Sequence, residues 1–347
     1  MSTIPSEDTG KETSESDGAA MGSGADGAPG ERLADSAETP DSAGAKVVRT
    51  AVAAVVVYAL FDMLLPLIPI HPHHSHTQAE AYARFFMTQL LPTGVFMMLQ
   101  VWLASRLVAL RLPVGRAVAV TAMSTVLWFA VLRFVAPAHH LSHYVNFVLA
   151  LARPTLLGLF LTVGLSALGM LLSRIIRERN VLLPVALVAM PIDYVGAMTN
   201  IGFTNNVVKN APSVVAAVSV PVPHVGGLHP LALIGPGDAL FMAFFFSAIQ
   251  RLRMNERGTF WWMASLLAAT MLLVLVTGLP IAALVPMGIA VIAANAGFFK
   301  LKREEVFAVI YAALIVFVIV GVFYVVAHRY MAVPPPPTPT AVKLHSH

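Results

Sequence analysis

Nine long apolar runs are the feature that most constrains this chain. Each is close to the ~20 residues that a helix needs to cross ~30 Å of hydrocarbon. They cover residues 48–70, 86–110, 115–136, 145–173, 181–201, 231–250, 259–278, 280–299 and 305–328. Only 12% of the residues are charged, about half the share found in a water-soluble domain. The sequence therefore predicts an all-α, polytopic transmembrane helix bundle of about nine spans in residues 46–330.

The two ends of the chain differ from this middle part. Residues 1–45 are rich in Ser, Gly, Ala, Asp and Glu and contain no aromatic residue. They cannot bury enough apolar surface to offset the entropy of ordering, so we expect a disordered acidic tail. Residues 331–347 form a second tail, which is rich in proline. The longest internal loop, at about 202–230, leaves no room for a soluble domain of useful size.

Lysine and arginine residues predict the orientation. After residue 45, fourteen of them lie on one side of the predicted bundle and six on the other. The positive-inside rule then places the N-terminus in the cytoplasm and the C-terminus outside. Because the basic residues follow this topology, they indicate a lipid bilayer and no nucleic-acid partner. The chain has no cysteine, which excludes disulfides, thiolate catalysis and cysteine-ligated metal sites.

Three aspartates fall inside the apolar runs: Asp62, Asp193 and Asp238. An ionisable group at that depth costs several kcal/mol unless it is paired or hydrated, so each is a candidate functional residue. Asp193 lies 14 residues beyond Arg179, and Asp238 lies 13 residues before Arg251. At 1.5 Å per residue, both carboxylates are about 20 Å from the same charged edge. We expect them to face each other if their helices are neighbours.

Asp238 ends the segment Gly235-Pro236-Gly237-Asp238, which would break or loosen a helix. One interpretation is a turn in the outer loop, in which Asp238 merely caps the helix that follows. Residues 239–251, however, span only about 20 Å as a helix, which is too short to cross the hydrocarbon. Residues 231–234 must then lie in the membrane with Asp238. Irregular backbone persists there only where protein packs on it or water reaches it, so we favour a water-accessible functional site.

These motifs resemble the intramembrane aspartyl proteases of the presenilin and signal peptide peptidase type. That family carries Tyr-Asp on one span, Gly-x-Gly-Asp on the next, and Pro-Ala-Leu at the start of the second span after that. Residues 235–238 match the second element, Leu279-Pro280-Ile281-Ala282 is a loose match to the third, and Ile192-Asp193-Tyr194 has its tyrosine after the aspartate. The resemblance covers about residues 181–300. It departs from the family in placing the aspartates on the fifth and sixth spans, where the family has them on the sixth and seventh.

The resemblance implies an aspartic endopeptidase that hydrolyses transmembrane peptide or protein substrates within the membrane, with Asp193 and Asp238 as the catalytic dyad. Five further residues would shape or line the site: Tyr194, Gly235, Pro236, Gly237 and Pro280. The orientation is that of signal peptide peptidase, which implies type II substrates. Residues 214–222 have strand-like composition and, by resemblance, would pair with the unwound substrate. No metal or cofactor is needed, because one carboxylate deprotonates water while its protonated partner donates to the scissile carbonyl.

A cation, proton or metal-ion transporter is the alternative. Asp62 lies at the same depth as the other two aspartates, and three acids at one level would suit an ion pathway. All twelve histidines fall on the outer side: His71, His73, His74, His76, His139, His140, His143, His224, His229, His328, His345 and His347. Imidazoles from several loops would suit a transition metal, although such loops are more often simply solvated. Asp62 would otherwise pair with a polar group or with Arg133. A third class, a non-catalytic scaffold or receptor, would lose nothing from Asp193→Ala.

Overall fold

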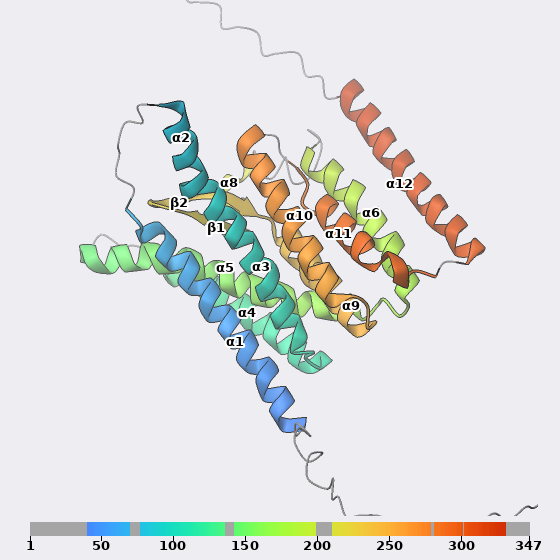
Figure 1. Ribbon diagram of the computed structural model, residues 1–347, viewed down its shortest axis with the longest axis horizontal. Helices are drawn as coiled ribbons and strands as arrows, with labels where there is room; N and C mark the ends of the chain where they lie inside the picture. Colours follow the sequence, from blue (N-terminus) through green and yellow to red (C-terminus); the bar gives the residue numbers. More distant parts are fainter. Residues whose placement is uncertain are drawn as a thin grey trace, which may run out of the picture. The chain divides into compact units, whose positions relative to one another are not determined.

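Helices make up most of the described chain, and a two-stranded hairpin interrupts them (Figure 1). The computed structural model describes residues 40–69, 77–135, 142–198, 210–278, 281–300 and 302–330. The α-helices are α1 (Pro40–Leu64), α2 (Gln78–Phe85), α3 (Leu91–Ala109), α4 (Val114–Phe134), α5 (His143–Ser173), α6 (Arg179–Met198), α8 (Pro212–Val218), α9 (Pro236–Arg251), α10 (Glu256–Thr277), α11 (Leu284–Asn295) and α12 (Arg303–Tyr330). Short helical turns are η1 (Leu65–Leu67), η2 (Phe86–Leu90) and η3 (Ala296–Phe298), and the strands are β1 (Val220–His224) and β2 (Gly227–Ile234).

Six helices in the described part of the chain are long and apolar enough to cross a membrane. They cover Gly44–Leu67, Gln78–Ala109, Val114–Phe134, His143–Ser173, Arg179–Gly196 and Glu256–Thr277. Many of their large apolar side chains are exposed, as on α4, where Met123, Val126 and Phe129 point outward. Such faces suit lipid, which is as apolar as they are. The predicted helical, membrane-type fold is therefore confirmed in its coarse form, and it is compatible with an integral membrane protein.

α9 lies in the core of the bundle, packed against α3 and α5. Every side chain from Met242 to Gln250 is buried, so α9 has no lipid-facing stripe over that length. Gly169 of α5 allows the close approach, because a Cβ atom there would lie 2.8 Å from the backbone nitrogen of Phe244 and 2.9 Å from the carbonyl oxygen of Leu240. Small residues let helix backbones meet in this way in membranes.

A second group of helices contains α6, α10 and α11, which lie side by side in Figure 1. α11 packs against both α6 and α10, and it also touches α9. Gly288 of α11 brings it close to α6, since a Cβ atom at that position would lie 2.7 Å from the Cγ atom of Met190. α12 packs on α6. α11 therefore connects the helix that carries Asp193 to the helix that carries Asp238.

The predicted apolar run at 231–250 is not one helix. Its first residues belong to β2, and the helix begins only at Pro236. The strand-like stretch at 214–222 is also divided, because residues up to Val218 are helical and β1 begins at Val220. β-branched residues favour a strand chiefly where a neighbouring strand is available to pair with them. β2 provides that neighbour for β1.

The predicted tails fall mostly outside the described residues. Residues 1–39 and 331–347 are not described. α1 begins at Pro40, a few residues inside the region that composition assigned to the acidic tail. A proline at the start of a helix is favourable, because its missing N–H group would have no partner there.

Candidate functional site

Asp193 lies near the end of α6 and reaches across to the start of α11. Its Oδ2 atom accepts a hydrogen bond from the backbone N–H of Leu284 at 3.0 Å. Leu284 is the first residue of α11, so the carboxylate satisfies one of the free N–H groups that a helix N-terminus presents. Pro191 precedes Asp193 by two residues inside α6. A proline there removes a backbone hydrogen bond, and α6 is therefore weakened immediately before its aspartate.

Asp238 occupies the third position of α9. Its Oδ2 atom accepts a hydrogen bond from the backbone N–H of Gly235, the N-cap residue, at 3.2 Å, which is the half of a capping box that the N3 side chain supplies. Pro236 fills the first helical position. The interpretation of Asp238 as the residue that starts the helix is therefore wrong in detail, because Gly235 is the N-cap and Asp238 supports it from within the first turn. This contact leaves the other carboxylate oxygen without an assigned role, and it does not explain why a second aspartate lies nearby.

Asp193 and Asp238 come together although they belong to different helices. Asp193 binds the first residue of α11, α11 packs against both α6 and α9, and Asp238 lies in the first turn of α9. The contact of α11 with both α6 and α9 explains how the approach is held. Two buried or half-buried acids that approach each other do not ionise independently, because like charges repel strongly in a low-dielectric site.

The two glycines that flank Pro236 have different surroundings. A Cβ atom on Gly235 would lie 3.2 Å from the Oδ2 atom of Asp238, so this glycine is needed for the capping contact. A Cβ atom on Gly237 would meet nothing within 4 Å. Gly237 therefore borders open space beside Asp238, and the sequence motif alone did not distinguish the two positions.

The hairpin leads directly into this site. β1 and β2 pair antiparallel, with Val220 opposite Ile234, Pro221 opposite Leu233 and Val222 opposite Ala232. Val220 and Val222 are buried, and β1 packs on α3 and α5. Within the described residues β2 pairs with β1 alone, and Leu233 is 40% exposed. β2 therefore has an unpaired edge in the described chain, one residue before Gly235.

An apolar cavity of about 400 Å³ adjoins the start of α9. It lies along α4 and α5, and Pro236 and Val218 close it on the side of the site. The indole of Trp128 lines this cavity, and its buried Nε1–H group has no hydrogen-bond partner among the described residues. The cavity has the size and character to hold apolar side chains of a bound segment.

Asp62 does not join the pair. It is buried at 6% exposure, and its Oδ2 atom accepts a hydrogen bond of 2.5 Å from the hydroxyl of Thr155 on α5. Tyr58, one turn earlier on α1, lies close enough for electrostatic interaction with it. The expectation that Asp62 pairs with a polar group is confirmed, with Thr155 as the partner and not Arg133. Nothing in the sequence identified Thr155, because the rotation of α5 about its axis is fixed only by packing.

The remaining predicted site residues are placed as follows. Tyr194 is 50% exposed on α6, so it turns away from the core beside Asp193. Pro280 lies outside the described residues, although Ala282, two residues later, is buried. Eight of the twelve histidines also lie outside them: His71, His73, His74, His76, His139, His140, His345 and His347. In the described part of the chain no three His, Cys, Asp or Glu residues are grouped as metal ligands, so the metal hypothesis stays a prediction.

Sequence reasoning missed two contacts of the site. The backbone N–H of Leu284 is invisible to any side-chain pattern. The packing of Met190 over Gly288 fixes the distance between α6 and α11, and no local signal marks it.

Comparisons with protein families, with curated proteins and with solved structures find no match to this chain.

Proposed function

We propose that this protein is an intramembrane aspartyl protease that hydrolyses peptide bonds of transmembrane substrates, with Asp193 and Asp238 as its dyad. One observation carries the proposal. The carboxylate of Asp193 on α6 binds the first residue of α11, Asp238 lies in the first turn of α9, and α11 packs against both α6 and α9. A paired-acid arrangement within hydrocarbon is costly, and proteins retain it chiefly where it has a function.

The pair supports hydrolysis by general acid–base catalysis. When the two acids share one proton, the ionised carboxylate takes a proton from water, and the resulting hydroxyl adds to the scissile carbonyl carbon. The protonated carboxyl donates its proton to the carbonyl oxygen, which gives a neutral gem-diol. Collapse of the diol breaks the C–N bond: the leaving nitrogen takes a proton from the carboxyl that had accepted it from water, and the other carboxylate takes a proton from a diol hydroxyl as the C=O bond re-forms. The products are a carboxylic acid and an amine, and the dyad returns to its starting state.

The hairpin would hold the substrate. A transmembrane helix must unwind before its carbonyl groups can be attacked, because helical hydrogen bonds occupy them. The edge of β2 can take an unwound segment as a third strand. Proline is tolerated in a β-ladder only where the ladder does not use its missing N–H group. Pro221 lies opposite Leu233, so we expect this pair not to be hydrogen-bonded to each other. The N–H of Leu233 then points to the open edge of β2. The cavity beside Pro236 would take the apolar side chains that leave the substrate helix.

The proposed membrane arrangement has nine spans with the N-terminus in the cytoplasm and the C-terminus outside. Six spans are the long apolar helices described above. The hairpin with α9, α11 with η3, and α12 would supply the other three. In this arrangement α6 runs outward and α9 runs inward, as in signal peptide peptidase, and type II transmembrane proteins would be the substrates.

Cleavage of a model transmembrane peptide in liposomes tests the proposal. Asp193→Asn and Asp238→Asn each keep an acceptor oxygen for the hydrogen bonds from Leu284 and Gly235, so the fold should persist. Each should lower the cleavage rate by about 100-fold or more, because general acid–base catalysis is worth that much. Asp62→Asn is the matched control, since it makes the same change at an acid outside the pair, and it should cleave at the wild-type rate.

Three results would count against a metal-free aspartyl protease. Cleavage at the wild-type rate by Asp193→Asn or Asp238→Asn would show that these two residues are not the catalytic dyad. Cation flux through protein-containing liposomes that stops in Asp62→Asn but continues in Asp193→Asn would favour the transporter. Peptide cleavage that chelators abolish would favour a metal site.

A further inference from the structure

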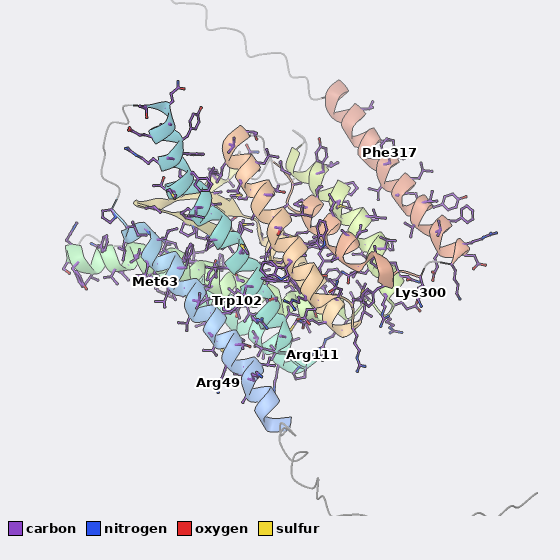
Figure 2. The ribbon with its side chains drawn as sticks, in the orientation of Figure 1. Arg49, Met63, Trp102, Arg111, Lys300 and Phe317 are labelled. Atoms are coloured by element: carbon purple, nitrogen blue, oxygen red, sulfur yellow. The ribbon has the colours of Figure 1, made fainter. Side chains whose placement is uncertain are left out.

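A basic cavity lies at the end of the bundle where α3, α5 and α9 terminate. It has a volume of about 410 Å³, and four arginines line it: Arg111, Arg174, Arg251 and Arg253. None of the described residues that line it is acidic. Figure 2 labels Arg111 at this end of α3. Four positive charges around one cavity, without a carboxylate in its described lining, attract an anion.

Two of the arginines have structural partners. Arg174 donates to the carbonyl oxygen of Leu112 at 2.5 Å, and Arg251 donates to the carbonyl oxygen of Ile176. Basic residues at helix C-terminal ends are ordinary, because the last carbonyl groups there have no helical partner. Arg174 and Arg251 are nevertheless close enough to repel each other. The carbonyl groups of Leu112 and Ile176 lie in the loops after α3 and α5, so the two contacts hold these loops and leave both positive charges without a carboxylate in the described lining.

The other two arginines lie in helix C-cap turns, where the backbone N–H of Arg253 bonds Gln250 and that of Arg111 bonds Val108. Arg111 follows α3 and Arg253 follows α9, and each has a positive φ angle, 46° and 52°. Glycine is the usual residue at such a position after a helix, because a side chain there is strained. In the described residues these are the only non-glycine residues with positive φ. Both side chains line the same cavity, and no hydrogen bond or ion pair to a described residue engages either guanidinium. The C-cap turns account for the backbone at both positions, and they leave the two guanidinium groups at the cavity with donors available to an anion.

Gln250 supplies a polar group of the opposite kind. Its side chain is 6% exposed and lines the cavity, and its Oε1 atom has no hydrogen-bond partner among the described residues. Its Nε2 atom is already engaged, donating to Glu256 at 2.6 Å. A buried acceptor without a donor is costly. A ligand that fits this cavity therefore carries an anionic group for the arginines and a hydroxyl donor for Gln250.

We infer that this cavity binds a phosphate ester with a hydroxylated headgroup, either the headgroup of an anionic phospholipid or a soluble phosphate ester. Arginine is suited to phosphate because its planar guanidinium makes paired hydrogen bonds to two oxygens. Basic pockets between the ends of membrane helices bind anionic headgroups. The depth expected for a lipid headgroup also fits. Trp102 and Trp261 line a neighbouring cavity, and tryptophan is enriched at the membrane interface, where headgroups lie.

The test measures thermal unfolding and native mass spectra of the full chain in detergent. Phosphatidylglycerol should raise the unfolding midpoint by roughly 5 °C, and phosphatidylcholine should not. Arg111→Gln with Arg253→Gln should weaken phosphatidylglycerol binding by about tenfold or more. Replacing the same two arginines with lysine should weaken binding less than glutamine does, because the charge remains while the paired hydrogen bonds are lost. The matched control is Arg116→Gln with Arg177→Gln, which removes two exposed charges that do not line the cavity.

Each outcome decides the inference. Equal effects of phosphatidylglycerol and phosphatidylcholine on the wild-type chain would overturn it without any variant, so misfolding of a variant cannot hide the answer. Equal loss of binding in the control pair would reduce the effect to surface charge and would also overturn it. Protection by glycerol 3-phosphate as strong as by the lipid would support the site and assign it to a soluble ester, whereas protection by the lipid alone would assign it to the headgroup.

Discussion

The carboxylate of Asp193 on α6 accepts a hydrogen bond of 3.0 Å from the backbone N–H of Leu284, the first residue of α11. This bond connects two helices that are far apart in the sequence, and it caps the second of them. It gives Asp193 a structural role that is separate from chemistry. A loss of activity on its removal therefore needs a stability measurement beside it.

We expect Asp193→Ala to destabilise the protein by about 0.5–2 kcal/mol, because it leaves the Leu284 N–H without its cap. Asp193→Asn should retain the wild-type unfolding midpoint, since the amide oxygen accepts the same bond. Thermal unfolding in detergent distinguishes the two variants. If both unfold at the wild-type temperature, the Leu284 contact contributes nothing to stability.

The two glycines before Asp238 should respond differently to alanine. Gly237→Ala should leave stability unchanged or raise it by up to about 1 kcal/mol, because alanine is the better helix former and open space surrounds the position. It should still slow peptide cleavage, because the methyl group enters the space beside Asp238. Gly235→Ala should lower both stability and cleavage, because its Cβ atom would lie 3.2 Å from the Asp238 carboxylate. Parallel unfolding and cleavage assays check this, and a Gly237→Ala enzyme with normal cleavage would exclude substrate from that space.

One backbone hydrogen-bond donor can be removed from the open edge of β2 by a single substitution. Leu233→Pro deletes the N–H that we place on the open edge, so it should raise KM for a transmembrane peptide with little change in the β1–β2 ladder. Leu233→Ala keeps the N–H and is the control, with a much smaller expected effect. Steady-state cleavage over a range of peptide concentrations separates KM from kcat. Identical kinetics of the two variants would mean that the substrate does not pair with β2.

Thr155→Val tests the role of Asp62. The 2.5 Å hydrogen bond between their side chains would be lost, and a buried carboxylate would remain without its partner. We expect a loss of about 1–3 kcal/mol in the free energy of unfolding. Cleavage per folded molecule should be unchanged, because Asp62 is separate from the dyad. A variant of wild-type stability with altered cleavage would contradict both statements.

Gly169→Ala tests the packing of the core. The added methyl would meet backbone atoms of α9 at 2.8–2.9 Å, and backbone atoms cannot move aside as a side chain can. We expect a loss of about 1–3 kcal/mol through overpacking. Gly115→Ala is the control on α4, where nothing lies within 4 Å, and it should be neutral or slightly stabilising. The unfolding midpoints of the two variants give the answer.

Much of the helical fold follows from the sequence, because apolar runs of about 20 residues leave few alternatives in lipid. Each predicted run contains a helix, but the run at 231–250 is divided at Gly235 into a strand and a helix. Residues 235–237 mark that break in the sequence. The pairing of β2 with β1 could not be predicted in the same way, because counting apolar residues gives no information on which segments pair. The helical state of Pro212–Val218 likewise opposes its local β-propensity.

The candidate site follows from the sequence in part. Depth counting along α6 and α9 placed Asp193 and Asp238 at one level, and in the structure α11 packs against both of these helices. The same count placed Asp62 with them, and it was insufficient there, because depth says nothing of the direction in which a side chain leaves its helix. Tyr194 illustrates the same limit, since a neighbour of Asp193 in sequence faces away from it by about 100° in a helix.

The enclosure of the short helix α9 has a consequence for the ends of that helix. Its 16 residues measure about 24 Å along the axis, and the 12 residues of α11 measure about 18 Å. Both are shorter than an ordinary hydrocarbon layer. Protein surrounds α9 from Met242 to Gln250, so the packing of α3 and α5, and not the lipid, must shield the polar backbone groups at its two ends. A change that separates α5 from α9 would therefore cost more than the lost apolar contacts, because it would also uncover those backbone groups.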